Sequence, residues 1–216
     1  MHGEYKMTVT ITPRPNIGSS GIIDDGGFEG FGSGGFDDDD LLIFGDEIDN
    51  ILTGGAGHDK IEGEGGNDTI TGGEGNDFLG GGAGDDDLDG QGGPGTFEKD
   101  KLFGDAGNDI LRAGHGFDEL TGGTGNDTFG FYAVGHFEVK DFVAGEDRLF
   151  FDSEKTNITN IDELAALVTD VRLVNVDDTN PNNDGLLVEF VDGAATITFI
   201  GITDVADLTQ DIIFNL

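Results

Sequence analysis

Cysteine and tryptophan are absent from this chain of 216 residues, proline occurs four times, and lysine and arginine together number only ten. Without cysteine the chain forms neither disulfides nor thiolate metal sites. Ten basic residues beside 45 acidic ones cannot provide the basic face that nucleic-acid binding requires. No apolar run reaches the ~18–20 residues of a transmembrane helix. These absences exclude a disulfide scaffold, a nucleic-acid binder and a protein with a transmembrane segment.

The chain is instead rich in negative charge and glycine. Its formal net charge is -35, it contains 40 glycines, and hydrophobic residues make up only 35%. Such a chain repels itself, and high charge with low hydrophobicity is typical of disorder. The compact alternative is a fold ordered by multivalent cations such as Ca²⁺, which neutralise carboxylates as they bind.

Glycine divides the chain into three parts, with 9 glycines in residues 1–44, 26 in 45–130 and 5 in 131–216. We predict a mostly flexible Gly/Asp-rich leader over 1–44, containing one alternating segment, Met7–Thr12, that favours a strand. The leader lacks the basic and apolar regions of a Sec signal peptide. Residues 45–130 form the repeat described next, and residues 131–216 are predicted to form a β-rich cap.

Residues 45–130 repeat every nine residues, with glycine favoured at positions 1, 2 and 4 of each unit. Position 8 is apolar in all nine units, and position 6 is aspartate in all but the first, which has Asn50. A disordered low-complexity segment does not hold two chemically opposite positions in phase over nine units. The position-6 aspartates are Asp59, Asp68, Asp77, Asp86, Asp100, Asp109, Asp118 and Asp127.

This period predicts a coil of two units, about 18 residues long, with tight turns along two edges. Glycines at positions 1, 2 and 4 permit positive φ angles, and positions 7–9 form a short strand whose middle side chain points inward. The aspartates of every second unit then lie on the same edge. We expect Asp59, Asp77, Asp100 and Asp118 on one edge, and Asp68, Asp86, Asp109 and Asp127 on the other.

Neighbouring turns on one edge enclose two carboxylates and several backbone carbonyls, a set of about six oxygen ligands that suits Ca²⁺. We therefore predict about seven bound Ca²⁺ ions and a repeat that is unfolded without them. The site that pairs Asn50 with Asp68 should be weaker or empty. Residues 94–98 should loop out of the sixth unit, and Lys99 and Lys101 should weaken the site of Asp100 electrostatically.

The C-terminal part has the patterns of ordinary short strands and one helix. The helix is predicted over Ile161–Val168, with Asn160 as its N-cap and Glu163 three residues later. An Asp192–Gly193 turn should connect two of the strands. The predicted strands are Phe137–Phe142, Arg148–Phe151, Val171–Val176, Leu186–Val191, Thr196–Ile200 and Asp211–Leu216.

Units 54–89 and 104–130 resemble the RTX, or hemolysin-type, calcium-binding repeat. The segment Asp141–Leu149, with the pattern D-F-x-x-G-x-D-x-L, is similar to the cap that follows such repeats. The acidic and apolar ending Asp211–Leu216 resembles the family's uncleaved type I secretion signal. The resemblance implies an all-β fold, a right-handed parallel β-roll with a C-terminal β-rich cap and a short helix. It also implies a bacterial protein that type I secretion machinery exports and that calcium folds outside the cell.

Motifs of the effectors that accompany such repeats are missing. The sequence has no H-E-x-x-H and no G-x-S-x-G, and its four histidines lack metal-ligand spacing. An acidic segment, 178–184, approximates the spacing of a calcium loop, but Asn183 stands where such a loop needs glycine. We read that segment as a connection between strands, and we predict no catalytic residue.

Three functions remain open at this point. The favoured one is a secreted, non-enzymatic calcium-binding protein acting at the cell surface or matrix. The second is a calcium-dependent module of an adhesin or of a polysaccharide-modifying enzyme such as an epimerase, with anionic polysaccharide as its partner. The third is an enzyme with an unrecognised site in the C-terminal part.

Overall fold

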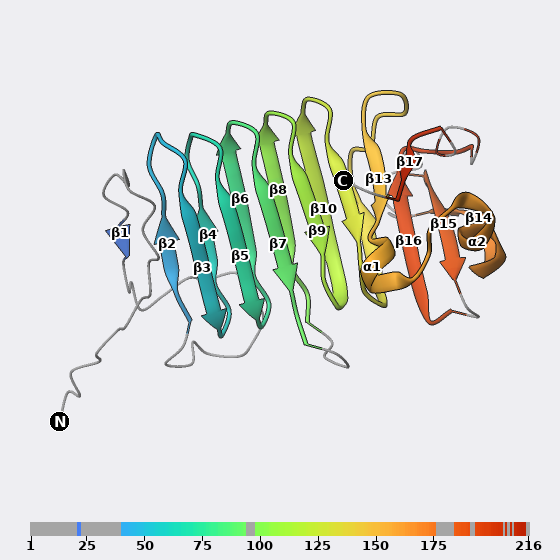
Figure 1. Cartoon of the computed structure of the whole chain (residues 1–216), viewed down its shortest axis with the longest axis horizontal. Coiled ribbons are helices and arrows are strands. Elements are labelled where there is room, and N and C mark those ends of the chain that lie inside the picture. Colours follow the sequence, from blue (N-terminus) through green and yellow to red (C-terminus); the bar gives the residue numbers. More distant parts are fainter. Residues whose placement is uncertain are drawn as a thin grey trace.

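The computed structural model describes residues 21–22, 40–93, 98–175, 184–190, 193–204, 206, 208 and 210–214. The segment Met7–Thr12, predicted as a strand, lies outside them. Within the described part, two sheets face each other, and the chain crosses from one to the other with almost every successive strand (Figure 1). The fold is a right-handed parallel β-roll, as the sequence predicts.

One sheet has ten strands, in the order β1-β2-β4-β6-β8-β10-β12-β16-β15-β14. Their bounds are β1 Gly21–Ile22, β2 Leu42–Phe44, β4 Lys60–Glu62, β6 Phe78–Ala83, β8 Lys101–Ala106, β10 Gly116–Thr124, β12 Gly135–Val139, β14 Val168–Asn175, β15 Asp184–Phe190 and β16 Ala195–Ile200.

The other sheet has seven strands, in the order β17-β13-β11-β9-β7-β5-β3. Their bounds are β3 Ile51–Ala56, β5 Thr69–Glu74, β7 Asp87–Gln91, β9 Ile110–Ala113, β11 Thr128–Phe131, β13 Arg148–Phe151 and β17 Ile212–Ile213. Several strands exceed the three residues predicted, because ladder pairing continues through the glycine bends, as in the pair Gly55 and Gly73.

The coil length follows from the pairing register. Within the repeat, corresponding residues of adjacent coils are 18 residues apart, as in the hydrogen bond from the Asp59 N–H to Asp77 Oδ1. The spacing becomes 23 where the extra residues of the sixth unit intervene, as between Asp77 and Asp100. Asp100 thus resumes the register, as predicted. Of residues 94–98, which were expected to loop out, 94–97 lie outside the described part. Glu98 does not loop out, because its carbonyl oxygen accepts the Phe117 N–H of the next coil at 2.8 Å.

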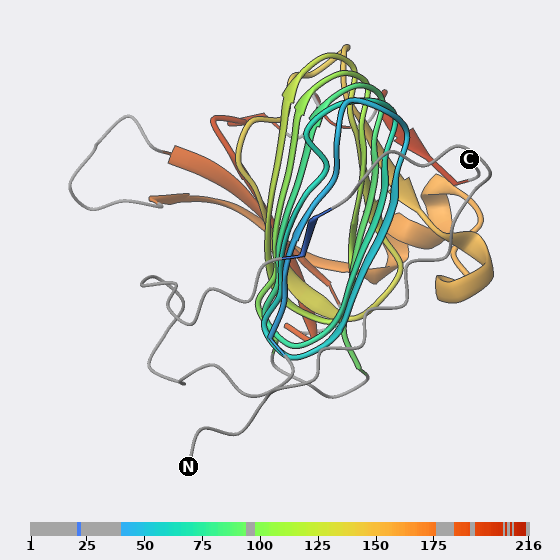
Figure 2. The same cartoon turned by 90° about the vertical axis from the view of Figure 1, so that its left-hand side faces the viewer.

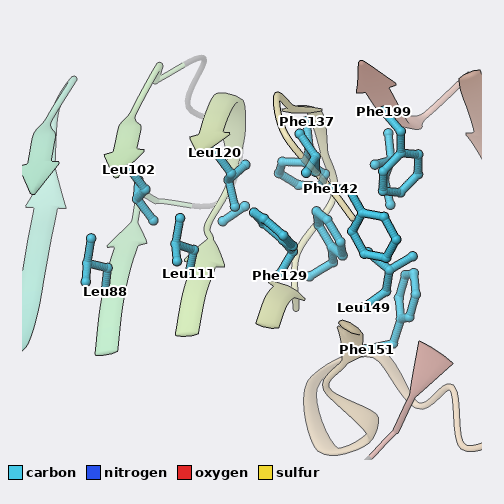
Figure 3. Close-up of a cluster of buried hydrophobic side chains, with 14 of the residues drawn as sticks. Leu88, Leu102, Leu111, Leu120, Phe129, Phe137, Phe142, Leu149, Phe151 and Phe199 are labelled. Carbon is cyan, nitrogen blue, oxygen red and sulfur yellow. The ribbon is translucent and has the colours of Figure 1, made fainter. Parts of the chain in front are cut away.

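The core is a single file of position-8 side chains between the sheets. The two sheets contribute alternately, and the row passes from leucines to phenylalanines toward the C-terminal end (Figure 3). Leu88, Leu102, Leu111, Leu120 and Phe129 are all fully buried. The inward direction predicted for position 8 is therefore correct, and the narrow core leaves little apolar area to stabilise each coil.

Parallel stacking continues beyond residue 130. Strand β12 pairs with β10, and β13 pairs with β11. Strands β16 and β17, far along the chain, then pair in parallel with β12 and β13. The antiparallel hairpin β14–β15 extends from one flank of the roll, and the helices lie on the opposite flank (Figure 2).

Most predicted elements of the C-terminal part are present. Helix α2 spans Ile161–Leu167, and Asn160 Oδ1 accepts the Glu163 N–H, which is the expected N-cap. A second, four-residue helix, α1, spans Ser153–Thr156 and was not predicted. The strand predicted over Phe137–Phe142 ends earlier, at Val139, because residues 140–147 make the next turn of the roll. Among the described residues, neither helix is long and apolar enough to span a bilayer.

Candidate calcium-binding edges

Most turns of the roll have positive φ at positions 2 and 4. At position 4, glycines such as Gly57 and Gly75 adopt the positive φ. At position 2, even the non-glycine residues Glu64 and Asp105 have φ near +70° (73° and 72°). The backbone path, rather than the residue, therefore sets the left-handed geometry, and glycine adopts it with the least strain.

Position 1 uses glycine for a different reason from the one predicted. Its φ lies outside the left-handed region in units such as Gly54 and Gly104. A Cβ at Gly104 would come closer than 3.0 Å to Asp109 Oδ2 and to the carbonyl oxygen of Gly122. Glycine is needed here because the aspartate and the next coil occupy the space of a side chain.

The position-6 aspartates form the two rows that the period predicts. In each row, the Oδ1 of one aspartate accepts the backbone N–H of the position-6 residue one coil earlier. Asp100 Oδ1 accepts the Asp77 N–H, and Asp118 Oδ1 accepts the Asp100 N–H, at 2.9 and 3.0 Å. On the other edge, Asp109 Oδ1 accepts the Asp86 N–H at 2.8 Å. All eight side chains are buried, with at most 2% exposed.

The second carboxylate oxygen of these aspartates is not used in the same way. Among the described residues, Oδ2 is buried and accepts no hydrogen bond in Asp68, Asp77, Asp86, Asp100, Asp109 and Asp118. In all of these except Asp118, Oδ2 lies beside the glycine that begins its own turn, and several also lie near a carbonyl oxygen of the next coil. A buried carboxylate oxygen without a donor is costly, so this arrangement calls for a cation.

The pKa values of the aspartates also indicate a cation site. Burial, followed by the charges of neighbouring carboxylates, raises the pKa of Asp77 to about 8 and that of Asp100 to about 9. The same causes raise the pKa of Asp68 and of Asp109 to about 7. In the fold without metal, the raised pKa values favour protonated carboxyls near neutral pH, and a divalent ion would displace the protons.

The donor set fits calcium. Each gap offers hard oxygens only, from two carboxylates and the backbone. Among the described residues, no three histidine or acidic side chains converge on a common metal position. A calcium ion between two coils would therefore draw its remaining ligands from backbone carbonyls, as expected from the sequence.

Two irregular positions have distinct surroundings. Asn50 is buried at the start of one row, where its Oδ1 accepts the Asp46 N–H and its Nδ2 donates to Asp46 Oδ1. Lys99 and Lys101 both form ion pairs with Glu119. That these lysines weaken the site of Asp100 stays a prediction.

Asp147 is a further member of one row that the sequence reading did not single out. It is 3% exposed, and its Oδ1 accepts the Asp127 N–H at 2.9 Å. Residues 142–150 keep glycine at position 4 (Gly145, φ 83°), aspartate at position 6 and buried Leu149 at position 8. The spacing G-x-D-x-L in the sequence was the signal that could have identified Asp147 as a member of the row. Unlike the repeat aspartates, Asp147 has both oxygens occupied, because Oδ2 accepts the Val143 N–H.

A second ladder runs beside the aspartates, through position 5. Asn67 Oδ1 accepts the Asp85 N–H, and Asp85 Oδ1 accepts the Asn108 N–H. On the other edge, His58 Nδ1 accepts the Asn76 N–H. The recurring Asn, Asp or His at position 5 thus ties adjacent coils together. Most of the acidic segment 178–184 lies outside the described residues, and Asp184 begins β15.

The model of one protein family matches this region. The RTX calcium-binding nonapeptide repeat (4 copies) matches residues 44–79, 70–97 and 94–129. Residues 44–129 are RTX repeats. The RTX segment contains all eight position-6 aspartates, and its geometry is that of a calcium-binding β-roll module.

Solved structures similar to this chain include two from bacteria. The AlgE6R3 subunit of the mannuronan C5-epimerase from Azotobacter vinelandii is 19% identical, with a TM-score of 0.36, over 79% of this chain and 80% of that chain. The extracellular lipase LipA from Serratia marcescens is 18% identical, with a TM-score of 0.31, over 80% of this chain and 40% of that chain. The sequence has no significant match among curated proteins.

Proposed function

We propose that the chain is a secreted, non-enzymatic calcium-binding protein that folds on binding Ca²⁺ outside the cell and acts at the cell surface or matrix. The observation that carries the calcium part is the pair of rows of buried aspartates whose Oδ2 atoms accept no hydrogen bond among the described residues. Calcium would satisfy those oxygens and remove the repulsion between neighbouring carboxylates.

The proposed ligands are the eight position-6 aspartates. Four members on each edge, with Asn50 added to one row, leave three and four gaps between coils. Seven Ca²⁺ ions would therefore occupy the roll, and their charge would offset most of the excess of acidic residues in 45–130 (twenty acidic and four basic). Asn50 lacks a carboxylate, so its gap is the weakest of the seven.

Export is proposed on the grounds of the repeat and the tail. RTX repeat proteins are typically secreted, and the ending Asp211–Leu216 has the acidic and apolar pattern of a type I signal. Extracellular calcium modules bind at ~10⁻⁴–10⁻³ M. The chain would stay unfolded at low cytosolic calcium, suitable for a narrow channel, and calcium would then favour the folded state outside.

The central experiment compares two adjacent aspartates. Asp86 is a buried member of a row, whereas Asp85 is exposed at position 5, where other units carry asparagine. We expect D86N to lower the number of bound Ca²⁺ ions in isothermal titration and to shift calcium-dependent folding, followed by circular dichroism, to higher calcium. D85N should behave as the natural sequence does. A full β-signal of the natural sequence in chelator at pH 8 would refute calcium-dependent folding.

A second candidate function, binding of anionic polysaccharide, is favoured by the outer face of the ten-stranded sheet. Four of the ten basic residues lie there: Lys60, Lys99, Lys101 and Lys140. Lys60 Nζ lies 4.8 Å from the centre of the Phe78 ring, and Phe78 stacks on Phe103. Rings and ammonium groups side by side suit a sugar chain that carries carboxylates.

A groove of about 350 Å³ continues this face toward the cap, lined in part by Phe117, His136 and Thr196. Phe117 stacks on His136, and His136 Nδ1 lies 2.9 Å from Thr196 Oγ1. We expect K101Q/K140Q to reduce calcium-dependent retention on a polyuronate column. R148Q, on the seven-stranded sheet, is the matched control. Equal retention of both variants and the natural sequence would refute this role for the face.

A further inference from the structure

Strand β14, Val168–Asn175, forms one end of the ten-stranded sheet. It pairs with β15 along one side, and no described strand pairs with its other side. The free side therefore presents backbone N–H and C=O groups with which another strand can pair. Figure 2 shows the hairpin β14–β15 extending away from the two stacked sheets. At eight residues, β14 is long for an open edge, because edge strands are commonly kept short or blocked.

The inner face of β14 is apolar and exposed. Val171 and Leu173 are 39% and 60% exposed. In the register with β15 they lie opposite Val188 and Leu186, which are both buried. Residues that lie opposite one another share a face of the sheet, so Val171 and Leu173 extend the core-facing side beyond the core. A strand added at this edge would bring further side chains against them.

The outer face of β14 carries one negative and one positive charge. Because side chains alternate along a strand, Asp170 and Arg172 point away from the face that carries Val171. Arg172 forms ion pairs with Asp170 and with Glu189 of β15. The Arg172 side chain is still 50% exposed, which leaves it accessible to a further carboxylate. The free edge thus presents opposite charges two residues apart.

This spacing makes the edge complementary to itself. When two β14 strands pair antiparallel, their inner faces stay together only if the twofold axis passes through a residue, because a shift by one residue exchanges the faces. An axis at Val171 places Asp170 of each copy opposite Arg172 of the other. An axis at Asp170 or at Arg172 would place like charges face to face, which is destabilising. The charges therefore select the register centred on Val171.

We propose that β14 is a self-association edge, through which two copies of this chain join their ten-stranded sheets with a twofold axis at Val171. On the inner face, Val171 then lies opposite its own copy, and Leu173 lies opposite Thr169 of the other chain. One strand pair buries less than the ~1,200–2,000 Å² of a stable interface, so the dimer is weak and depends on concentration. The inference does not depend on the proposed calcium sites, which lie in the turns of the roll.

The test is sedimentation velocity of the whole chain in saturating calcium, over a hundredfold range of protein concentration. Physiological ionic strength screens the repulsion between two acidic chains beyond about 8 Å. We expect the natural sequence to dimerise reversibly. D170R and R172D should each weaken the dimer roughly tenfold, because each places like charges opposite one another at two points. D162R, at an exposed position of α2, makes the same change of charge as D170R and should dimerise as the natural sequence does.

Mixing the two single variants separates pairing across the axis from a change within one hairpin. In an equimolar mixture of D170R and R172D, every opposed pair again joins unlike charges, so a heterodimer should form with about the affinity of the natural dimer. Circular dichroism checks that each variant is folded. A mixture that stays as weak as its components would overturn the proposal, as would dimers of D170R equal to those of the natural sequence.

Hydrogen exchange of the natural sequence provides an independent readout. The β14 amides that face the free edge should become protected as the protein concentration rises. A natural sequence that is monomeric throughout the range would overturn the proposal. Protection of those amides in such a monomer would show that a segment of the same chain, rather than a second copy, occupies the edge.

Discussion

Each position-6 aspartate uses its two carboxylate oxygens for different tasks. Oδ1 joins adjacent coils through a backbone N–H, as Asp127 does with Asp109 at 2.9 Å. Oδ2 faces the turn, and in Asp109 it accepts no hydrogen bond from the described residues. The hydrogen bond of Oδ1 holds adjacent coils together, whereas Oδ2 is left available to bind a cation. One residue type therefore couples folding to metal binding.

The raised pKa values predict a pH dependence of the calcium-free fold. Burial raises the pKa of Asp77 to about 8 and that of Asp100 to about 9, well above the ~3.9 of an unfolded aspartate. A raised folded-state pKa adds stability at low pH, which is lost as the pH rises through the folded value. Metal-free protein should therefore show more β-signal at pH 5.5 than at pH 9. Equal signals at both values would contradict this prediction.

Glycine at position 1 gives a second prediction at this scale. Gly54→Ala would place a Cβ against Asp59 Oδ2 and the Gly72 carbonyl oxygen. Because backbone must shift, we expect a loss of roughly 1–3 kcal/mol in the free energy of unfolding. Urea unfolding in saturating calcium measures it. Ala56→Ser, at an exposed site in the same turn, should change stability by less than ~0.5 kcal/mol.

At the scale of elements, a coil is two short strands and two turns around one pair of inward side chains. Such a unit buries too little apolar surface to hold itself, so it depends on its neighbours. Near the C-terminal end the core widens, and Phe142 packs against both Phe129 and Phe199. The cap thus supplies the larger apolar cluster against which the narrow coils stack.

Truncation of a core side chain should show this dependence. Leu111, at the centre of β9, is fully buried between coils. We expect Leu111→Ala to lower the free energy of unfolding by about 2–5 kcal/mol through the cavity it leaves. Leu173, in β14, is 60% exposed, and Leu173→Ala should have little effect. Urea unfolding in saturating calcium compares them, and equal losses would contradict a single-file core.

At the scale of the whole molecule, the formal net charge of -35 is distributed in two ways. The aspartate rows place carboxylates in buried gaps between coils, whereas most other acidic groups of the described residues are at least partly exposed. Salt screens exposed charges over distances of about 10 Å, but screening does not supply a cation that a buried carboxylate oxygen can bind. Screening and calcium binding should therefore have separable effects.

We accordingly expect 1 M NaCl to leave the calcium-free chain largely unfolded at pH 8, whereas millimolar CaCl₂ folds it. Circular dichroism and radius of gyration provide the readouts. MgCl₂ at equal ionic strength is the control, because Mg²⁺ is smaller and dehydrates reluctantly. Folding by NaCl or by MgCl₂ alone would show that general screening, rather than inner-sphere calcium ligation, orders the roll.

The sequence alone determined the regular part of this protein. Nine-residue spacing of aspartate and apolar side chains led to the coil, the two rows and the buried file of position 8, because each depends on contacts one coil apart. The RTX resemblance supplied the handedness and the cap. The reason for glycine at position 1 was missed, because it lies in space shared with the next coil.

Tertiary structure determined the parts of the protein that do not follow the nine-residue repeat. Strand β16 joins the roll through contacts such as that of His136 with Thr196, 60 residues apart, and Gly145 donates to Asp211, 66 residues apart. Within a repeat, the spacing in the sequence determines which residues lie side by side. The surroundings of an irregular residue depend instead on where distant segments of the chain lie in the fold.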